Sequence, residues 1–224
     1  MPPTTAVKSR NPLAPRIKGL TLRSARTPDD DLVEDAMIRG VVYDGTLFAG
    51  QHIELAEVEA ARFENARFTG ARTRQVIFSD TTFDTCDFAQ LRAEDTSLVR
   101  AEVRTSRITG ASWSKSHFAD VRFEGCRSDM SLWRHSKFKG VTFAGCNLTQ
   151  ADFQWAELRD VVFTGCDLTG VQFAHVQVQR VRFENCTMLD VGGGSFLKGA
   201  TVQGAGAMEL ALALVRDAGI RVEN

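Results

Sequence analysis

The sequence predicts an all-β solenoid whose coils have four sides. The first observation is a five-residue period: from Val33 to Met188 almost every fifth residue is apolar, and a small residue lies two positions before most of them. A period of five fits neither a helix, which repeats every 3.6 residues, nor a flat strand, which repeats every two. The chain must therefore turn at each repeat, and a fixed short period over about 160 residues is typical of a solenoid.

A second period, of twenty residues, gives the number of sides. Cys126, Cys146, Cys166 and Cys186 are spaced by twenty, and Cys86 lies forty residues before the first of them. Twenty residues are four repeats, so equivalent residues stack along the axis about 5 Å apart, and about eight coils would form a rod roughly 38 Å long. A disulfide ladder or a metal site would be the functional interpretation of this column. No C-x2-C spacing is present, and a cytosolic location disfavours disulfides, so we interpret the cysteines as small core residues.

The N-terminal segment 1–27 differs from the rest. The five prolines all lie within the first 28 residues, and this segment has six basic residues and no acid. We expect a basic, proline-containing arm that is partly disordered, although Ile17, Leu20 and Leu22 could attach part of it to the body. The run Thr27–Asp31 indicates the start of a short helix that would form an N-terminal cap.

The β-helix is expected to cover residues 28–204, with a break of phase at Gly192–Gly194. Leu197 and Val202 resume the period one residue early. Residues 205–224 should form a C-terminal capping helix and a tail, because Gly219 is a helix stop signal.

Five residues of this helix are candidates for the cap or for a dimer contact. Met208, Leu212 and Val215 would share one face and cover the last coil. Leu210 and Leu214 broaden the apolar surface, which could cover more of the coil or meet a second subunit.

Three of the five-residue repeats show the pattern best: Cys146-Asn-Leu-Thr-Gln, Ala151-Asp-Phe-Gln-Trp and Cys166-Asp-Leu-Thr-Gly. They resemble the bacterial-type pentapeptide-repeat family, whose pattern is A-[DN]-[LF]-x-x, and the resemblance covers about 31–191. It implies a right-handed quadrilateral β-helix in which the small and central residues point inward. Some members dimerise through the C-terminal end, so the resemblance also implies a homodimer.

One column of outward residues is a candidate interaction site. Lys115, His135, Trp155 and His175 lie twenty residues apart, two positions after a central residue. An exposed tryptophan between two histidines would suit partner recognition. It could also be a dimer contact, or a ring that lies flat on its neighbours. The two histidines should be about 10 Å apart, too far to share a metal ion.

One central position is a serine. Ser128 lies where the pattern expects a large apolar residue, so we expect either a β-bulge or a buried hydroxyl bonded to the local backbone.

The sequence shows no catalytic constellation. The four histidines take outward positions, and the glycine run 192–194 is not followed by the Lys-Ser/Thr of a phosphate loop. We therefore expect no enzyme activity and no cofactor. The N-terminus has no apolar stretch typical of a secretory signal, and no apolar run is long enough to cross a membrane, so a cytoplasmic location is expected.

Charge is distributed unevenly. Residues 28–64 have ten acids against two bases, a net charge of −8, whereas residues 97–140 have nine bases against four acids, a net charge of +5. The acidic end could attract the basic arm and the basic belt could meet an acidic partner, or both could serve solubility.

The leading hypothesis for function is a protein-interaction module that presents flat β faces to a macromolecule. The alternative comes from the resemblance: some family members mimic DNA, bind type II topoisomerases such as DNA gyrase, and confer resistance to quinolones. A DNA mimic of ~38 Å would need about twenty negative charges, but residues 41–198 have 18 bases against 20 acids. Direct nucleic-acid binding is less favoured still, because no aromatic and basic platform is visible in the sequence.

Overall fold

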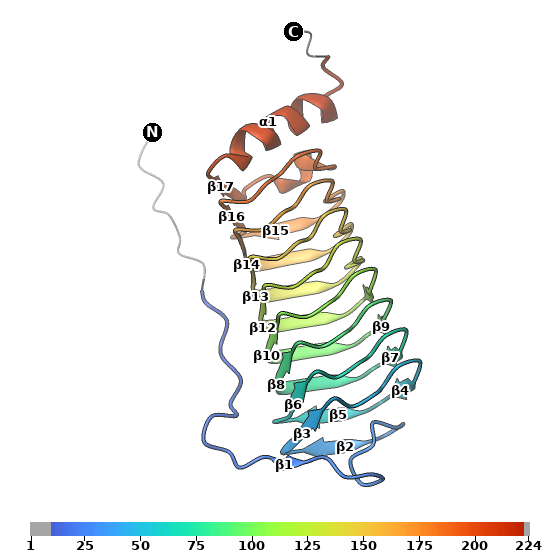
Figure 1. The fold of residues 1–224 in the computed structure, drawn as a ribbon. Coiled ribbons are helices and arrows are strands. Elements are labelled where there is room, and N and C mark those ends of the chain that lie inside the picture. The colour runs from blue at the N-terminus through green and yellow to red at the C-terminus, as the bar shows by residue number, and fades with distance from the viewer. Residues whose placement is uncertain (1–9, 222–224) are drawn as a thin grey trace.

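The computed structural model describes residues 10–221 and shows an elongated rod of stacked coils with a helix at one end (Figure 1). Each coil has four sides, and every strand pairing is parallel. Paired residues are twenty apart through most of the rod, as in Phe123 opposite Phe143. The four-sided β-helix expected from the two periods is confirmed.

Two sides of the rod carry most of the strands. Side 1 consists of β2 (Met37–Arg39), β5 (Glu57–Glu59), the first halves of β8 (Ile77–Asp84), β10 (Ser97–Arg104), β12 (His117–Glu124), β13 (Lys137–Ala144) and β14 (Glu157–Thr164), and β15 (Gln177–Gln179). Side 2 consists of β3 (Val41–Asp44), β6 (Arg62–Glu64), the second halves of β8, β10, β12, β13 and β14, and then β16 (Arg182–Glu184) and β17 (Thr201–Gln203).

The other two sides are less regular. Side 3 is a column of isolated bridges that begins at Leu47 opposite Arg67 and ends at Asp167 opposite Thr187. Side 4 begins with β4 (His52–Glu54), β7 (Arg72–Arg74), β9 (Arg92–Glu94) and β11 (Ser112–Ser114), and single bridges continue it to Gly192. The predicted shift of phase is present at the end: Thr201 pairs with Arg182, nineteen residues earlier.

Aromatic stacks fill the interior of the rod. On side 2 the rings of Phe123, Phe143, Phe163 and Phe183 lie one above the other, with centroids 4.8–5.0 Å apart and planes within 7° of parallel. Each aromatic pair contributes about 0.5–1.5 kcal/mol beyond its area of burial. The five-residue repeat therefore gives a continuous core along the axis.

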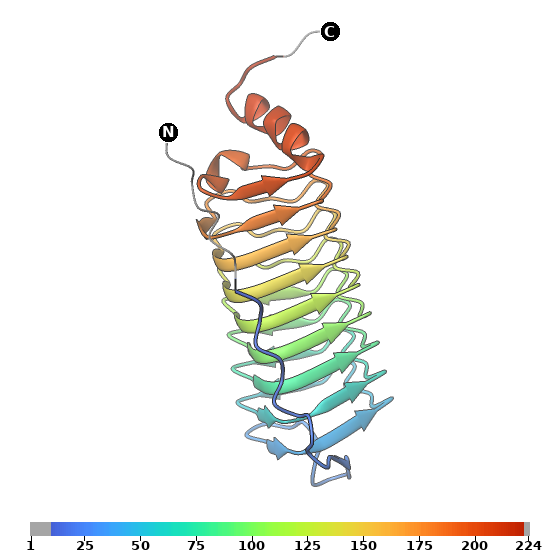
Figure 2. The same ribbon diagram turned by 90° about the vertical axis from the view of Figure 1, so that its left-hand side faces the viewer.

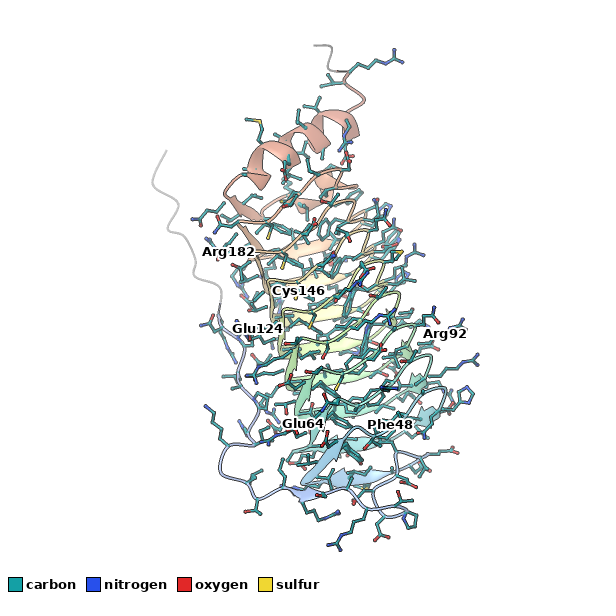
Figure 3. The ribbon with its side chains drawn as sticks, viewed as in Figure 1. Phe48, Glu64, Arg92, Glu124, Cys146 and Arg182 are labelled. Carbon is teal, nitrogen blue, oxygen red and sulfur yellow. The ribbon has the colours of Figure 1, made fainter. Side chains whose placement is uncertain are left out.

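The cysteine column belongs to this core. Its five thiols are free and buried, and in Figure 3 Cys146 lies inside the rod whereas Arg92 projects from it. The thiol of Cys166 donates to the carbonyl oxygen of Phe143 at 3.4 Å. Burial raises the pKa of Cys86 to about 12. The interpretation of the cysteines as small core residues is confirmed by this burial.

The bulge considered at Ser128 is absent. The bridges from Arg127 to Arg107 below and Asn147 above keep the twenty-residue register. Ser128 is fully buried and its carbonyl accepts a hydrogen bond from Ser131 Oγ at 2.6 Å. The Ser128 hydroxyl itself has no hydrogen-bond partner among the described residues, so the expected bond of this hydroxyl to the local backbone is wrong. The ring of Trp133, which packs edge-on against Phe143, fills the interior without any shift of the backbone.

The described part of the N-terminal arm lies along the corner between sides 1 and 2 (Figure 2). Asp120 accepts hydrogen bonds from Arg10 and from the backbone N–H of Leu13, and Asp80 accepts one from the N–H of Arg16 at 2.9 Å. Ile17 is buried. Residues 10–22 are therefore placed on the body, and residues 1–9 of the arm lie outside the described residues.

The prediction that a helix begins within Thr27–Asp31 is wrong. The arm ends in β1 (Arg23–Ser24), which pairs with β3, and the next residues form a turn. The buried carboxylate of Asp30 accepts hydrogen bonds from Arg23 and from the N–H of Arg26, and Tyr43 donates to the Asp30 carbonyl at 2.6 Å. These hydrogen bonds fix the turn, which covers the first coil where a helix was expected. Val33 is exposed, so inward repeats start at Ile38.

The C-terminal end has a 3-10 turn, η1 (Gly194–Leu197), and the helix α1 (Gly206–Asp217). Leu210 and Ala213 are buried against the last coil, whereas Met208 and Leu212 are 70% and 50% exposed. The expectation that Met208 and Leu212 cover the coil is therefore wrong.

Close backbone approach explains which face of α1 is buried. A side chain at Gly206 would begin only 2.4 Å from the carbonyl oxygen of Cys186, so the glycine lets the helix start directly on the coil. Leu210 then packs over Gly194. Val215 is half-buried and Leu214 is 40% exposed.

Candidate interaction surface

The predicted column lies at the corner where side 4 turns into side 1. Lys115, His135, Trp155 and His175 all have positive φ, between 53° and 62°. This left-handed conformation turns the chain and directs the side chain away from the core. All four residues are exposed, and Trp155 is 52% exposed.

Three rings of this column form a stack. The Trp155 and His175 ring centroids are 4.0 Å apart with planes 14° from parallel, and those of His135 and Trp155 are 6.2 Å apart with planes 12° from parallel. Lys115 does not join the stack, because its ammonium pairs with Glu94 at 3.1 Å.

A fourth ring extends the stack at its C-terminal end. Phe196 lies 4.7 Å from His175, with its plane tilted by 55°. Sequence reasoning missed this contact because Phe196 is out of phase. The glycine run 192–194 was the available signal, since the shift of phase that it marks places Phe196 beside His175. We call His135, Trp155, His175 and Phe196 the aromatic corner.

Side 1 next to this corner is basic over its later coils. Lys137 and Lys139 project from β13, and Arg159 projects from β14; all three are exposed. They line a shallow groove of about 450 Å³ that runs from β12 to β15. Lys137 pairs with Glu157 at 3.3 Å, whereas Lys139 and Arg159 have no ion-pair partner among residues 10–221. We call Lys137, Lys139 and Arg159 the basic strip.

Elsewhere the outward acids are largely neutralised by arginines. Arg100 donates two hydrogen bonds to Asp80 one coil below, and these bonds lower the pKa of Asp80. Arg180 likewise pairs with Asp160 and lowers its pKa. On side 4, Arg134 binds Asp152. These pairs leave no continuous column of unpaired carboxylates in the described part of the rod.

The exposed end of α1 forms a second apolar area. Leu212 and Ile220 line a groove of about 590 Å³ with Leu189, and an ion pair between Arg216 and Asp190, 2.6 Å long, lies beside it. Met208 is exposed on the same helix.

The residues of this surface are suited to non-covalent binding of a partner. In residues 10–221 there is no group of three His, Cys, Asp or Glu residues that could hold a metal ion. Within the same range, no helix is long and apolar enough to cross a membrane. The positively charged strip and the exposed rings can bind a macromolecule through hydrogen bonds, charge and apolar contact.

Comparison with known proteins agrees with the architecture. The sequence pattern of the pentapeptide repeat region matches residues 56–133 and 136–192, more than half of the chain. No curated protein sequence matches the chain. Among solved structures, HetL from the cyanobacterium Nostoc sp. strain PCC 7120, a pentapeptide repeat protein involved in heterocyst differentiation regulation, is 11% identical with a TM-score of 0.34, over 76% of this chain and 87% of HetL.

Two further structures are similar in the same way. Full-length QnrB1, a plasmid-mediated fluoroquinolone resistance protein, is 13% identical with a TM-score of 0.30, over 82% of this chain and 98% of QnrB1. A pentapeptide repeat protein of the Arabidopsis thaliana thylakoid lumen is 23% identical with a TM-score of 0.24, over 46% of this chain and 65% of that protein. Because the family pattern matches more than half of the residues, this chain belongs to the pentapeptide repeat family.

Proposed function

We propose that this protein is a non-enzymatic, cytoplasmic interaction module whose rod presents a binding surface to a partner protein. The observation that supports this most directly is the aromatic corner beside the basic strip. Tryptophan and arginine are residue types enriched at binding hot spots, and here Trp155 and Arg159 lie on the wall of stacked, hydrogen-bonded coils. Rigid walls lose little conformational entropy on binding.

The test is isolation and reconstitution of the partner. The purified chain, immobilised through its C-terminus, is exposed to extract of the source organism at about 0.15 M salt. Each retained protein is identified, purified and titrated against the free chain. Saturable binding at micromolar concentration supports the proposal, and its absence for every retained protein overturns it.

We further propose that the chain forms a homodimer through its C-terminal end. Met208 and Leu212 expose apolar surface there, next to the groove lined by Leu189 and Ile220. Exposed apolar area of this kind is typical of protein contacts. A two-fold interface would bring the same residues of two copies together.

A type II topoisomerase stays the alternative partner. The rod shape and the acidic first coils support it, but the pairing of Asp80, Asp160 and Asp152 with arginines weakens any mimicry of DNA. A supercoiling assay with gyrase from the source organism, with and without a fluoroquinolone, separates the alternatives. Inhibition of gyrase, or its protection from the drug, at micromolar concentrations of this protein would establish the topoisomerase as the partner. No effect would mean that the interaction module binds another partner.

A further inference from the structure

We propose that the aromatic corner and the basic strip form one docking site for an extended acidic segment of a partner protein. This inference rests on the proposed function and specifies its surface and the chemistry of its partner. Four observations support it: the continuity of the two surfaces, the unpaired charges, the orientation of the rings and the way in which the chain binds its own arm.

The corner and the strip are continuous along the chain. His135 lies two residues before Lys137, and Trp155 lies four residues before Arg159, so each coil passes directly from the corner into side 1. Parallel pairing then stacks these coils, with Lys139 opposite Arg159. One partner segment can therefore contact both surfaces at once.

The strip contains charges that the protein itself leaves uncompensated. Lys139 and Arg159 are direct neighbours across the β13–β14 pairing and lack ion-pair partners among residues 10–221. Like charges placed opposite each other on neighbouring strands repel. A carboxylate bound between them would remove this repulsion and accept charge-assisted hydrogen bonds from both.

The orientation of the rings favours a carboxylate over a nucleic-acid base. One face of Trp155 is covered by His175 at 4.0 Å, and the other is approached by His135 at 6.2 Å. Base binding needs open ring faces for stacking. The stack instead leaves ring edges exposed, and these edges have positive partial charge and N–H donors.

The rod already binds an extended segment of opposite charge at another corner. Asp80 and Asp120, two coils apart, hold the basic arm through the side chain of Arg10 and the backbone N–H groups of Leu13 and Arg16. The proposed site has the same geometry with the sign of the charge reversed. The described part of the arm lies on the far edge of side 1 and leaves the aromatic corner uncovered.

Trp155 provides a direct readout, because Trp113 and Trp133 are only 3% and 0% exposed. The probe is a peptide of ten glutamates, added to the full chain while tryptophan emission is recorded. The test variant is Lys139→Glu/Arg159→Glu. The matched control is Arg72→Glu/Arg92→Glu, which changes two exposed, adjacent arginines on side 4 by the same charge.

We expect a saturable change of emission that is at least tenfold weaker in the test variant and changes less than twofold in the control. With a fluorescein-labelled peptide, Trp155→Ala should weaken binding at least threefold in anisotropy. Thermal melting of each variant confirms that it is folded.

Several results would overturn the inference. One is that the test variant and the control variant weaken peptide binding equally, which would mean that only the net charge of the protein matters. Another is a ten-residue oligothymidylate that binds as tightly as the peptide, which would favour nucleic acid. A third is an isolated partner that binds the test variant unchanged; the proposed function would then stand and only this site would fall. Absence of any partner together with absence of peptide binding would overturn both.

Discussion

The indole N–H of Trp133 donates a hydrogen bond to Ser131 Oγ at 2.7 Å inside the rod. One coil earlier, Trp113 takes the same position and stacks on Trp133 with centroids 5.8 Å apart. In that earlier coil, Ala111 takes the place of Ser131, and the buried Nε1 of Trp113 has no hydrogen-bond partner among the described residues. Two stacked tryptophans thus differ in one hydrogen bond because of a single hydroxyl.

Ala111→Ser should supply that hydroxyl and stabilise the protein by about 1 kcal/mol, the usual net contribution of a hydrogen bond. The new hydroxyl can also donate to the Ile108 carbonyl, as Ser131 does to Ser128. Urea unfolding of both proteins measures the difference. Ser131→Ala is the matched control and should destabilise by about 1–3 kcal/mol, because it leaves the buried Trp133 N–H unpaired. A destabilised Ala111→Ser variant would show that the coil has no room for the oxygen.

The buried face of α1 can be tested by truncating one leucine at a time. Leu210→Ala should cost about 2 kcal/mol or more, because Leu210 is buried over Gly194 at the end of the core. Leu212→Ala should change the free energy of unfolding by less than about 0.5 kcal/mol, because its side chain is half-exposed. Guanidinium unfolding at low protein concentration gives both values. Equal losses would mean that the helix packs through a different face.

The dimer proposal makes a separate prediction about the exposed residues. Met208→Arg/Leu212→Arg should convert a dimer into a monomer in light scattering, because charges would replace the apolar contact. The melting temperature of the monomer should match that of the wild type diluted below its dimer dissociation constant. The control Lys198→Glu is exposed near the same end and should keep the assembly of the wild type. A wild type that is monomeric at all concentrations would rule out the dimer.

The five- and twenty-residue periods were enough to predict the coils, because each inward position is constrained by the residue twenty earlier. The ends were harder to predict. At the first coil, hydrogen bonds to the buried Asp30 fix a turn where three consecutive acids suggested a helix. At the last coil, the contact of Gly206 with the Cys186 carbonyl determined which face of α1 is buried, and hydrophobicity alone did not reveal it.

The candidate site was predictable only in part. The outward column at His135, Trp155 and His175 follows from the spacing, but Phe196 joins it through a shift of phase. Two residues of the basic strip, Lys137 and Lys139, belong to the basic segment 97–140, whose charges divide among four sides, and Arg159 lies outside that segment. Arg134, for example, belongs to side 4 and pairs with Asp152, whereas Lys139 faces side 1. Closeness in the sequence therefore does not show which charged side chains lie on the same side of the rod.

The attachment of the arm should depend on pH through Asp80. Its pKa is lowered in the folded state by the hydrogen bonds from Arg100 and by the N–H of Arg16, so ionised Asp80 favours folding. This stability is present above the ordinary aspartate pKa, ~3.9, and is lost as the pH falls through the lowered value. Asp80→Asn should cost about 1.5–3 kcal/mol at pH 7 and less at pH 2, which lies below the ordinary aspartate pKa. Urea unfolding at both pH values checks this, with Glu57→Gln, an exposed acid on side 1, as the matched carboxyl-to-amide control.

Trp155 should contribute little to folding even though its ring is stacked. It makes contact with His135 and His175 on the outside of the rod, so Trp155→Ala loses at most about 0.5–1.5 kcal/mol. Trp133→Ala should cost about 3–5 kcal/mol, since that indole is fully buried among phenylalanines. Trp155→Gly separates the contribution of ring stacking from the cost of the positive φ of 62° at this position. Both variants lose the stack, but glycine adopts positive φ without strain, so Trp155→Gly should be at least as stable as Trp155→Ala. Thermal unfolding of the three variants tests the order, and a loss for Trp155→Ala as large as that for Trp133→Ala would make Trp155 part of the core rather than of a binding surface.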